Sequence, residues 1–146
     1  MLTITQYEIL NACCNDVELF YFLFVEVNYG GQLFVREPGD TYRLHVDDKD
    51  WIIKVQAQDL IPEIVSLINE EFIDCWEIDR VGKWRKRTDV SVEDFVVYDN
   101  YNCKTFDEHL ERYDYGPHEF RATEKGTEEI AREEYRPYDQ QIGYGV

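Results

Sequence analysis

The chain has 146 residues, of which 44% are hydrophobic, so it is long enough and apolar enough to fold around one core. Its 31 acidic and 15 basic side chains give a formal net charge of −16, which as a whole repels phosphate backbones and lipid headgroups. The longest uncharged apolar run, residues 19–25, is too short to span a bilayer, and four cysteines without a CxxC spacing favour neither a disulfide framework nor a zinc ribbon. We therefore expect a cytoplasmic globular protein without a membrane partner.

The first two predicted elements are helices. Thr5 and Glu8 have the spacing of a capping box, which predicts a first helix that ends near Asn15. Residues 16–28 then form a run that is apolar on almost every side and stops at two glycines, 30 and 31. The favoured interpretation is a helix buried within the domain; a helix at an interface is the second, and a buried strand is also open.

A change of periodicity marks the middle of the chain. Between residues 41 and 57 apolar side chains alternate with polar ones, and the stretch 47–50 has turn-forming chemistry, so we predict a hairpin. Asp59 is then predicted to cap a third helix over residues 59–70. Pro62 is tolerated in its first turn, where an amide would have no partner.

A strand at 72–78, a turn at 79–82 and a basic return strand at 83–87 are predicted next. The bases of this hairpin, with the tryptophan between them, are Arg80, Lys83, Trp84, Arg85, Lys86 and Arg87. The favoured interpretation is a solvated, amphipathic edge strand with salt bridges to neighbouring acids. The alternative is that this strand lies along a phosphate backbone or stacks an unpaired base.

Residues 88–117 are predicted to be an inserted helical segment. Two short helices are expected there, because Ser91 and Asp94 have capping-box spacing and so do Thr105 and Glu108.

A strand and a helix complete the predicted domain. The strand covers residues 118–122, and the helix begins at Thr123. One domain is therefore expected over residues 1–135, followed by a mobile tail at 136–146.

Two stretches of the sequence resemble the winged-helix (winged helix-turn-helix) superfamily. In residues 59–80, DLIPEIVSLIN followed by EEFIDCWEI is similar to the third helix and first wing strand of that family. In residues 118–135, FRATEKGTEEI resembles its last strand and final helix. The resemblance implies an α+β, winged-helix-like domain with a small antiparallel sheet, here with the helical insertion inside the wing. It also implies that the third helix would enter a DNA groove.

The charges of the third helix oppose that mode of DNA binding. Residues 59–79 contain seven acids and no base, so phosphates would be repelled before any sequence could be read. We therefore expect a protein–protein interaction or regulatory module whose partner has a basic surface, with a homodimer as an additional alternative. The candidate partner-binding residues are Asp59, Glu63, Glu70, Tyr113 and Tyr115. The alternative function is a DNA-binding transcriptional regulator that uses the basic wing, residues 80–87.

Other chemistry is disfavoured by the sequence. His45 with the acids at 47–50 could bind a cation, but the stretch lacks the glycine and distal glutamate of a calcium loop, so a solvated turn is favoured. The pairs at 108–109 and 118–119 could supply an acid and a base, yet no nucleophile motif accompanies them. The Cys13–Cys14 pair is expected to be inert packing. We predict no enzymatic activity, no catalytic residue, no metal and no cofactor.

Overall fold

The computed structural model describes residues 2–29, 34–37, 41–44, 55–99 and 116–133. In chain order the elements are α1 (Ile4–Asn15), α2 (Phe20–Tyr29), β1 (Phe34–Glu37), β2 (Thr41–Leu44), α3 (Ala57–Asn69), β3 (Ile73–Ile78), β4 (Trp84–Arg87), the 3-10 helix η3 (Val92–Tyr98), β5 (His118–Ala122) and α5 (Glu124–Glu133). The described part of the chain is thus an α+β fold with five helices, a three-stranded antiparallel sheet and a separate two-stranded one. None of these helices has the length and apolarity needed to cross a bilayer.

The three-stranded sheet has the order β4-β3-β5, with both pairings antiparallel. The β3–β4 turn is tight because the Asp79 carboxylate accepts the amides of Val81 and Lys83, and Gly82 supplies a positive φ of 83°. At the other edge, Glu18 forms an antiparallel bridge with Phe120 of β5, with both hydrogen bonds at 2.8 Å. The outer edge of β4 is therefore the one that no described strand pairs.

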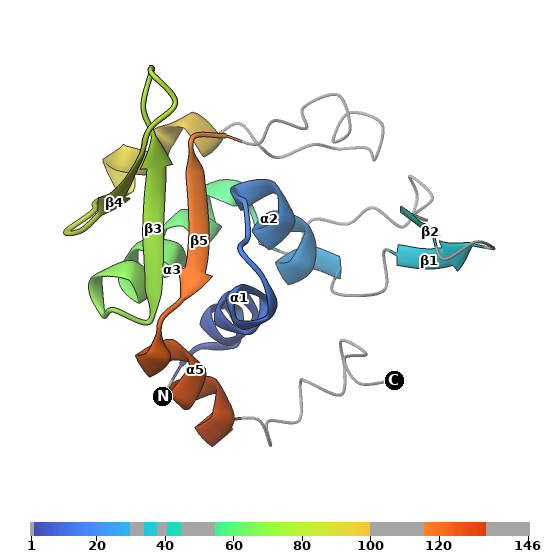
Figure 1. The fold of residues 1–146 in the computed structure, drawn as a ribbon. Helices are drawn as coiled ribbons and strands as arrows, with labels where there is room; N and C mark the ends of the chain where they lie inside the picture. The colour runs from blue at the N-terminus through green and yellow to red at the C-terminus, as the bar shows by residue number, and fades with distance from the viewer. Residues whose placement is uncertain (1, 30–33, 38–40, 45–54, 100–115, 134–146) are drawn as a thin grey trace.

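The core lies between the helices and one face of the sheet. Helix α3 buries its apolar stripe, including Leu60, Ile64 and Leu67, and Figure 1 shows α3 behind the sheet and α1 beside β5. Ile73 and Cys75 of β3 are buried on the α3 side, because alternate side chains of a strand point to opposite faces. Trp76 and Ile78 belong to the opposite face and are only half-buried.

Two predicted helix starts are wrong, because both helices begin earlier in the chain than expected. The capping box of α1 consists of Thr3 and Gln6, whose side chain accepts the Thr3 amide at 3.1 Å, and not of Thr5 and Glu8. The cause is that Glu8 faces inward and is 8% exposed, so its carboxylate is not placed at a helix start.

Helix α3 begins at Ala57, and its N-cap Gln56 lies three residues before the predicted cap, Asp59. Asp59 therefore lies within the first turn, where its negative charge interacts favourably with the helix dipole but does not cap the helix. Pro62 lies further inside the helix than expected.

The predicted hairpin over residues 41–57 is corrected at both ends. Strand β2 pairs with β1, which precedes it, in a register that places Phe34 opposite Leu44. Ala57, expected in the second strand, is buried at the start of α3. Residues 45–54, with the predicted turn and the His45 loop, lie outside the described part. Alternation identifies a strand but not which neighbour it pairs with.

The run at 16–28 is a buried helix, as favoured, although α2 begins only at Phe20. Residues before it are extended because the backbone of Glu18 pairs with β5. The buried amide of Asn28 holds the segment before α3: it donates to the Val55 carbonyl at 3.1 Å and accepts the Val55 amide at 2.8 Å.

The end of α3 is joined to the start of α5 by a compact junction. Glu71 has a φ of 65° and the Phe72 amide returns to Leu67 O at 2.9 Å, which is a Schellman ending. The Thr123 hydroxyl donates to Glu71 O at 2.6 Å and accepts the Gly126 amide at 3.0 Å. This threonine thus caps α5 and ties it to the turn before β3.

Lys125 and Gly126 complete the junction. The Lys125 ammonium donates to Glu70 O at 2.6 Å and lies 4.5 Å from the centre of the Phe72 ring. A Cβ on Gly126 would lie 2.1 Å from Phe72 O, so only glycine allows the backbones to approach so closely. The Thr-Glu-Lys-Gly segment is therefore a packing device in this structure.

Candidate functional site

The basic strand β4 lies at the sheet edge, and acids of its own sheet and of η3 bind its charges. Lys86 Nζ lies 3.2 Å from Asp74 Oδ1, and Arg85 Nε lies 3.5 Å from Asp79 Oδ2. Arg87 contacts the carboxylates of both Glu77 and Asp94. The edge strand with salt bridges that the alternation favoured is the arrangement found.

Two cations of the predicted wing remain without an acid. Arg80 and Lys83 lie at the β3–β4 turn, are exposed, and form no ion pair among the described residues. Val81 between them is 86% exposed, and Trp84 at the start of β4 is 38% exposed. Of the six residues predicted for nucleic-acid binding, only Arg80, Lys83 and Trp84 present groups that an external ligand could reach without competing with an ion pair.

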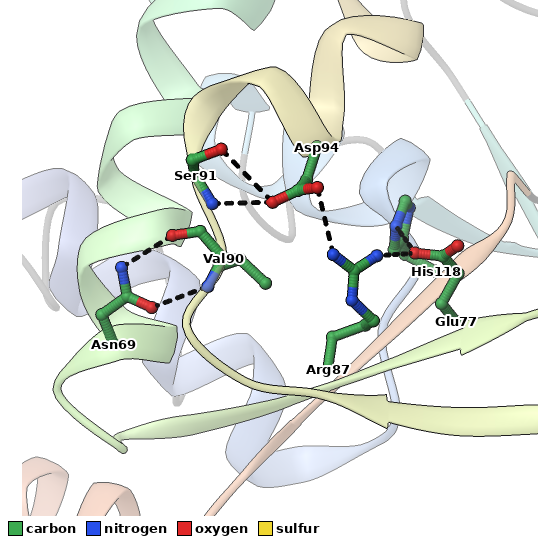
Figure 2. Close-up of polar contacts among 7 residues, drawn as sticks. All are labelled: Asn69, Glu77, Arg87, Val90, Ser91, Asp94 and His118. Atoms are coloured by element: carbon green, nitrogen blue, oxygen red, sulfur yellow. Dashed lines mark hydrogen bonds and ion pairs between the residues drawn. The ribbon is translucent and has the colours of Figure 1, made fainter.

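Arg87 is the centre of a chain of polar contacts at one end of the sheet, shown in Figure 2. Its guanidinium joins Glu77 of β3 to Asp94 of η3, where the distance from Nη2 to Asp94 Oδ1 is 3.0 Å. Asp94 in turn accepts the Ser91 amide at 2.8 Å, which closes the capping box predicted for this helix. We call Glu77, Arg87, Asp94, His118 and Tyr98 the sheet-end cluster.

His118 and Tyr98 continue the sheet-end cluster into the core. His118 Nε2 lies 3.2 Å from Glu77 Oε2, and Nδ1 lies 2.8 Å from the Tyr98 hydroxyl. Burial lowers the pKa of His118 and outweighs the attraction of Glu77, so the ring is neutral at neutral pH. Because the Glu77 carboxylate can only accept, Nε2 carries the proton, and Tyr98 donates to Nδ1.

The buried contacts of the sheet-end cluster hold parts of the fold together. His118 is 2% exposed and Tyr98 is 3% exposed, so neither can touch a substrate in this conformation. The Ser91 amide and then the Arg87 guanidinium lower the pKa of Asp94 by hydrogen bonding to its carboxylate, and the Arg87 bond fixes η3 on the sheet. Asn69 of α3 holds the same segment from the other side, bonding both backbone groups of Val90 (Figure 2).

The sequence did not reveal which acid pairs with His118. The adjacent Glu119 lies on the opposite face of β5, and the partner is instead Glu77, directly across the β3–β5 pairing. Strand alternation offers no signal for this pair until the register is known. The pair expected at 108–109 lies outside the described residues.

The predicted partner-binding acids lie on α3 or just beyond its end. Asp59 is exposed in the first turn of α3, and Glu70 is exposed just beyond its end. Glu63 between them is half-buried and accepts the Thr3 hydroxyl at 3.3 Å. Tyr113 and Tyr115 lie outside the part of the chain that the structure describes.

A hollow that the sequence did not indicate lies between α2 and the outer face of the sheet. It has a volume of about 430 Å³ and an apolar lining: Val17, Leu19, Phe22, Ile78, Trp84 and Gly116, with Glu119 as its one charged residue. A shallower hollow of about 250 Å³ shares Val17 and Phe22 with it and is lined also by Asp16, Glu18, Val25 and Glu26. Together we call them the α2–sheet groove.

Within the described part of the chain, no lysine or arginine forms an ion pair with the acids of the α2–sheet groove. Burial, with repulsion from Glu26 and Asp16, raises the pKa of Glu18 to about 8. Burial also raises the pKa of Glu26. Neither carboxylate forms an ion pair with a lysine or arginine of the described ranges.

The cysteines within the described ranges carry no reactive or metal site. Cys13 and Cys75 are buried, Cys14 is half-buried, and all three are free thiols. Burial raises the pKa of Cys75 to about 12 and that of Cys13 well above its usual range, so both remain protonated. No group of three or more potential metal ligands converges within the ranges 2–29, 34–37, 41–44, 55–99 and 116–133.

Comparisons of this chain with protein-family models, with curated proteins and with solved structures return no match.

Proposed function

We propose that the chain is a non-enzymatic, winged-helix-like interaction module that binds a protein partner with a basic surface. The observation that carries this proposal is the neutralisation of β4: Arg85, Lys86 and Arg87 are each held by an acid of the same domain. A phosphate backbone would have to replace those acids before it gained any contact.

The order of elements supports the winged-helix part of the proposal. Three helices, α1, α2 and α3, precede the β3–β4 hairpin, and α3 leads directly into it, as a third helix leads into a wing. The docking of α5 through Thr123 and Gly126 gives a packing role to the stretch that resembles the family's last strand and final helix. The insertion at 88–117 would then separate β4 from β5.

The charges of α3 support a protein partner over DNA. Asp59, Glu63 and Glu70 are its only charged residues from the first turn to the cap, so its exposed side offers carboxylates alone. Such a surface attracts lysine and arginine side chains and repels phosphates.

The proposal is tested by measuring duplex-DNA binding in parallel with protein capture. Fluorescence anisotropy with a labelled duplex at low salt should show weak binding by the native chain. The double variant D74N/D79N, which releases Lys86 and Arg85, should bind DNA more tightly. Proteins captured from a nuclease-treated lysate should be enriched in basic ones and should elute with salt. Tight, salt-sensitive DNA binding by the native chain, with no captured protein, would reject the proposal.

The exposed hairpin tip favours a second candidate function, a DNA-binding regulator that uses the wing. Within the described wing, Arg80 and Lys83 form no ion pair, and Trp84 beside them could stack on a base. In this case R80Q/K83Q should weaken DNA binding and reduce its salt dependence by about two counterions. The control R132Q removes a cation on α5 and should change little. Equal DNA affinity of the native chain and R80Q/K83Q would exclude this candidate.

A further inference from the structure

The α2–sheet groove owes its apolar floor to the register of the sheet. Ile78 and Trp84 are directly opposed in the β3–β4 pairing and share the face turned away from α3. Val17 and Leu19 reach the same hollow because the segment before α2 is extended along β5. The floor is therefore assembled from three separate segments: β3 and β4 pair with each other, and the segment before α2 is bridged to β5.

The rim of the groove is acidic. Asp16, Glu18 and Glu26 line the shallower end, and Glu119 lines the deeper one. The backbone of Glu18 is held at the sheet edge by two hydrogen bonds to Phe120, which places its side chain beside the groove. A positively charged group beside Glu18 and Glu26 would offset both their burial and their mutual repulsion.

This combination selects one class of occupant. Nucleic acid and lipid headgroups carry phosphates, which the rim repels. A bare metal ion would leave the apolar floor uncovered, and no convergent ligand set exists among the described residues. A protein segment with apolar side chains beside a cation satisfies both the floor and the rim. Arginine suits the site better than lysine, because it bonds carboxylates in a bidentate manner and stacks on an indole such as that of Trp84.

We propose that the α2–sheet groove binds a segment of a partner protein in which arginine alternates with bulky apolar residues. The apolar side chains lie on Val17, Phe22, Ile78 and Trp84, and the guanidinium groups contact Glu18 and Glu26. This inference rests on the proposed function as a protein-interaction module and moves the contact surface from α3 to the groove.

The test uses the full chain and three fluorescein-labelled synthetic peptides with Gly-Ser flanks. The core LRFRL has both features, LEFEL reverses the charge, and SRSRS removes the apolar anchors. We expect LRFRL to bind and the two others to bind at least about tenfold more weakly. Backbone amide shifts in a 1H–15N spectrum should change at Val17, Glu18, Phe22 and Trp84. No binding of LRFRL at about 1 mM would overturn the inference.

Variants locate the site and separate this inference from the proposed function. E18Q/E26Q, which conserves shape, should weaken LRFRL binding about tenfold, and V17S should weaken it through the floor. The control D59N/E70Q removes two acids from the α3 surface and should leave affinity unchanged. If D59N/E70Q loses the peptide and E18Q/E26Q does not, the groove is wrong but the interaction module survives. A concentration-dependent dimer that E18Q/E26Q abolishes would also overturn the inference, because a second copy would then occupy the groove.

Discussion

Replacing Gly126 by alanine tests the junction between α3 and α5. We expect it to lower the free energy of unfolding, although the same change stabilises most helices. In most helices this change is favourable by about 1 kcal/mol, because alanine is the better helix former. Here the new Cβ would lie 2.1 Å from Phe72 O and 2.9 Å from Leu10 Cδ1. The carbonyl cannot move freely, because it accepts the Thr123 amide at 3.0 Å and the Thr123 hydroxyl at 3.1 Å.

The magnitude follows from those two opposing effects. Overpacking by one carbon costs about 1–3 kcal/mol, and the upper end applies where the obstructing atom is anchored backbone. Subtracting the gain in helix propensity leaves a loss of about 2 kcal/mol in the free energy of unfolding of G126A.

Urea unfolding followed by circular dichroism measures this loss directly, provided the dependence on urea is unchanged. The control E128A changes an exposed residue of the same helix and should stay within about 0.5 kcal/mol of the native chain. A G126A protein as stable as the native chain, or more stable, would show that α5 does not approach the turn as described.

Three further predictions concern single residues of the same fold. E71G should stabilise the chain by about 1 kcal/mol, measured by urea unfolding, because Glu71 has a φ of 65° that glycine adopts without strain. For Glu18 the pKa is about 8 when folded and 4.5 when unfolded, so the folded state binds the extra proton and native stability falls as pH rises between these values. E18Q should therefore be more stable than the native chain at pH 8 and should lose this advantage towards pH 4.5; parallel unfolding curves across this range that keep a constant separation would contradict the assignment. For His118 the folded pKa is lowered, so in the E18Q background its contribution to the free energy of unfolding is lost as pH falls below 6.5. At neutral pH, 15N spectra should show a neutral ring protonated on Nε2. A cationic ring would refute the Tyr98–His118–Glu77 geometry.

Local patterns predicted the elements whose boundaries depend on nearby residues. The capping box of Ser91 and Asp94 was found from spacing alone, because both bonds lie within four residues. The start of α1 was missed for a related reason: Thr3 and Thr5 each have a suitable residue three positions on, and only the burial of Glu8 decides between them. A rule that uses spacing alone cannot choose between the two threonines.

Long-range pairing was beyond the sequence patterns. The contact between Glu77 and His118 spans 41 residues and exists because β5 pairs with β3 in one register. The α2–sheet groove likewise needs Ile78 and Trp84 to be opposed and the segment at Val17 to lie beside β5. Val17 and Ile78 looked unremarkable in the sequence, since a half-buried valine or isoleucine carries no signal of what lies across from it.

The same division explains why a resemblance in sequence does not settle the ligand of this fold. Thr123 and Lys125 donate to three successive backbone carbonyls, those of Glu70, Glu71 and Phe72, and Gly126 allows α5 to approach the last of them, so the motif constrains how α5 docks. Groups so engaged are not free to recognise a partner. A partner must be recognised by groups that the fold leaves without an ion pair, and among the described residues Glu18 and Glu26 differ in this respect from the bases of β4. On this proposal, carboxylates that border apolar surface attract a cationic protein segment and repel phosphate.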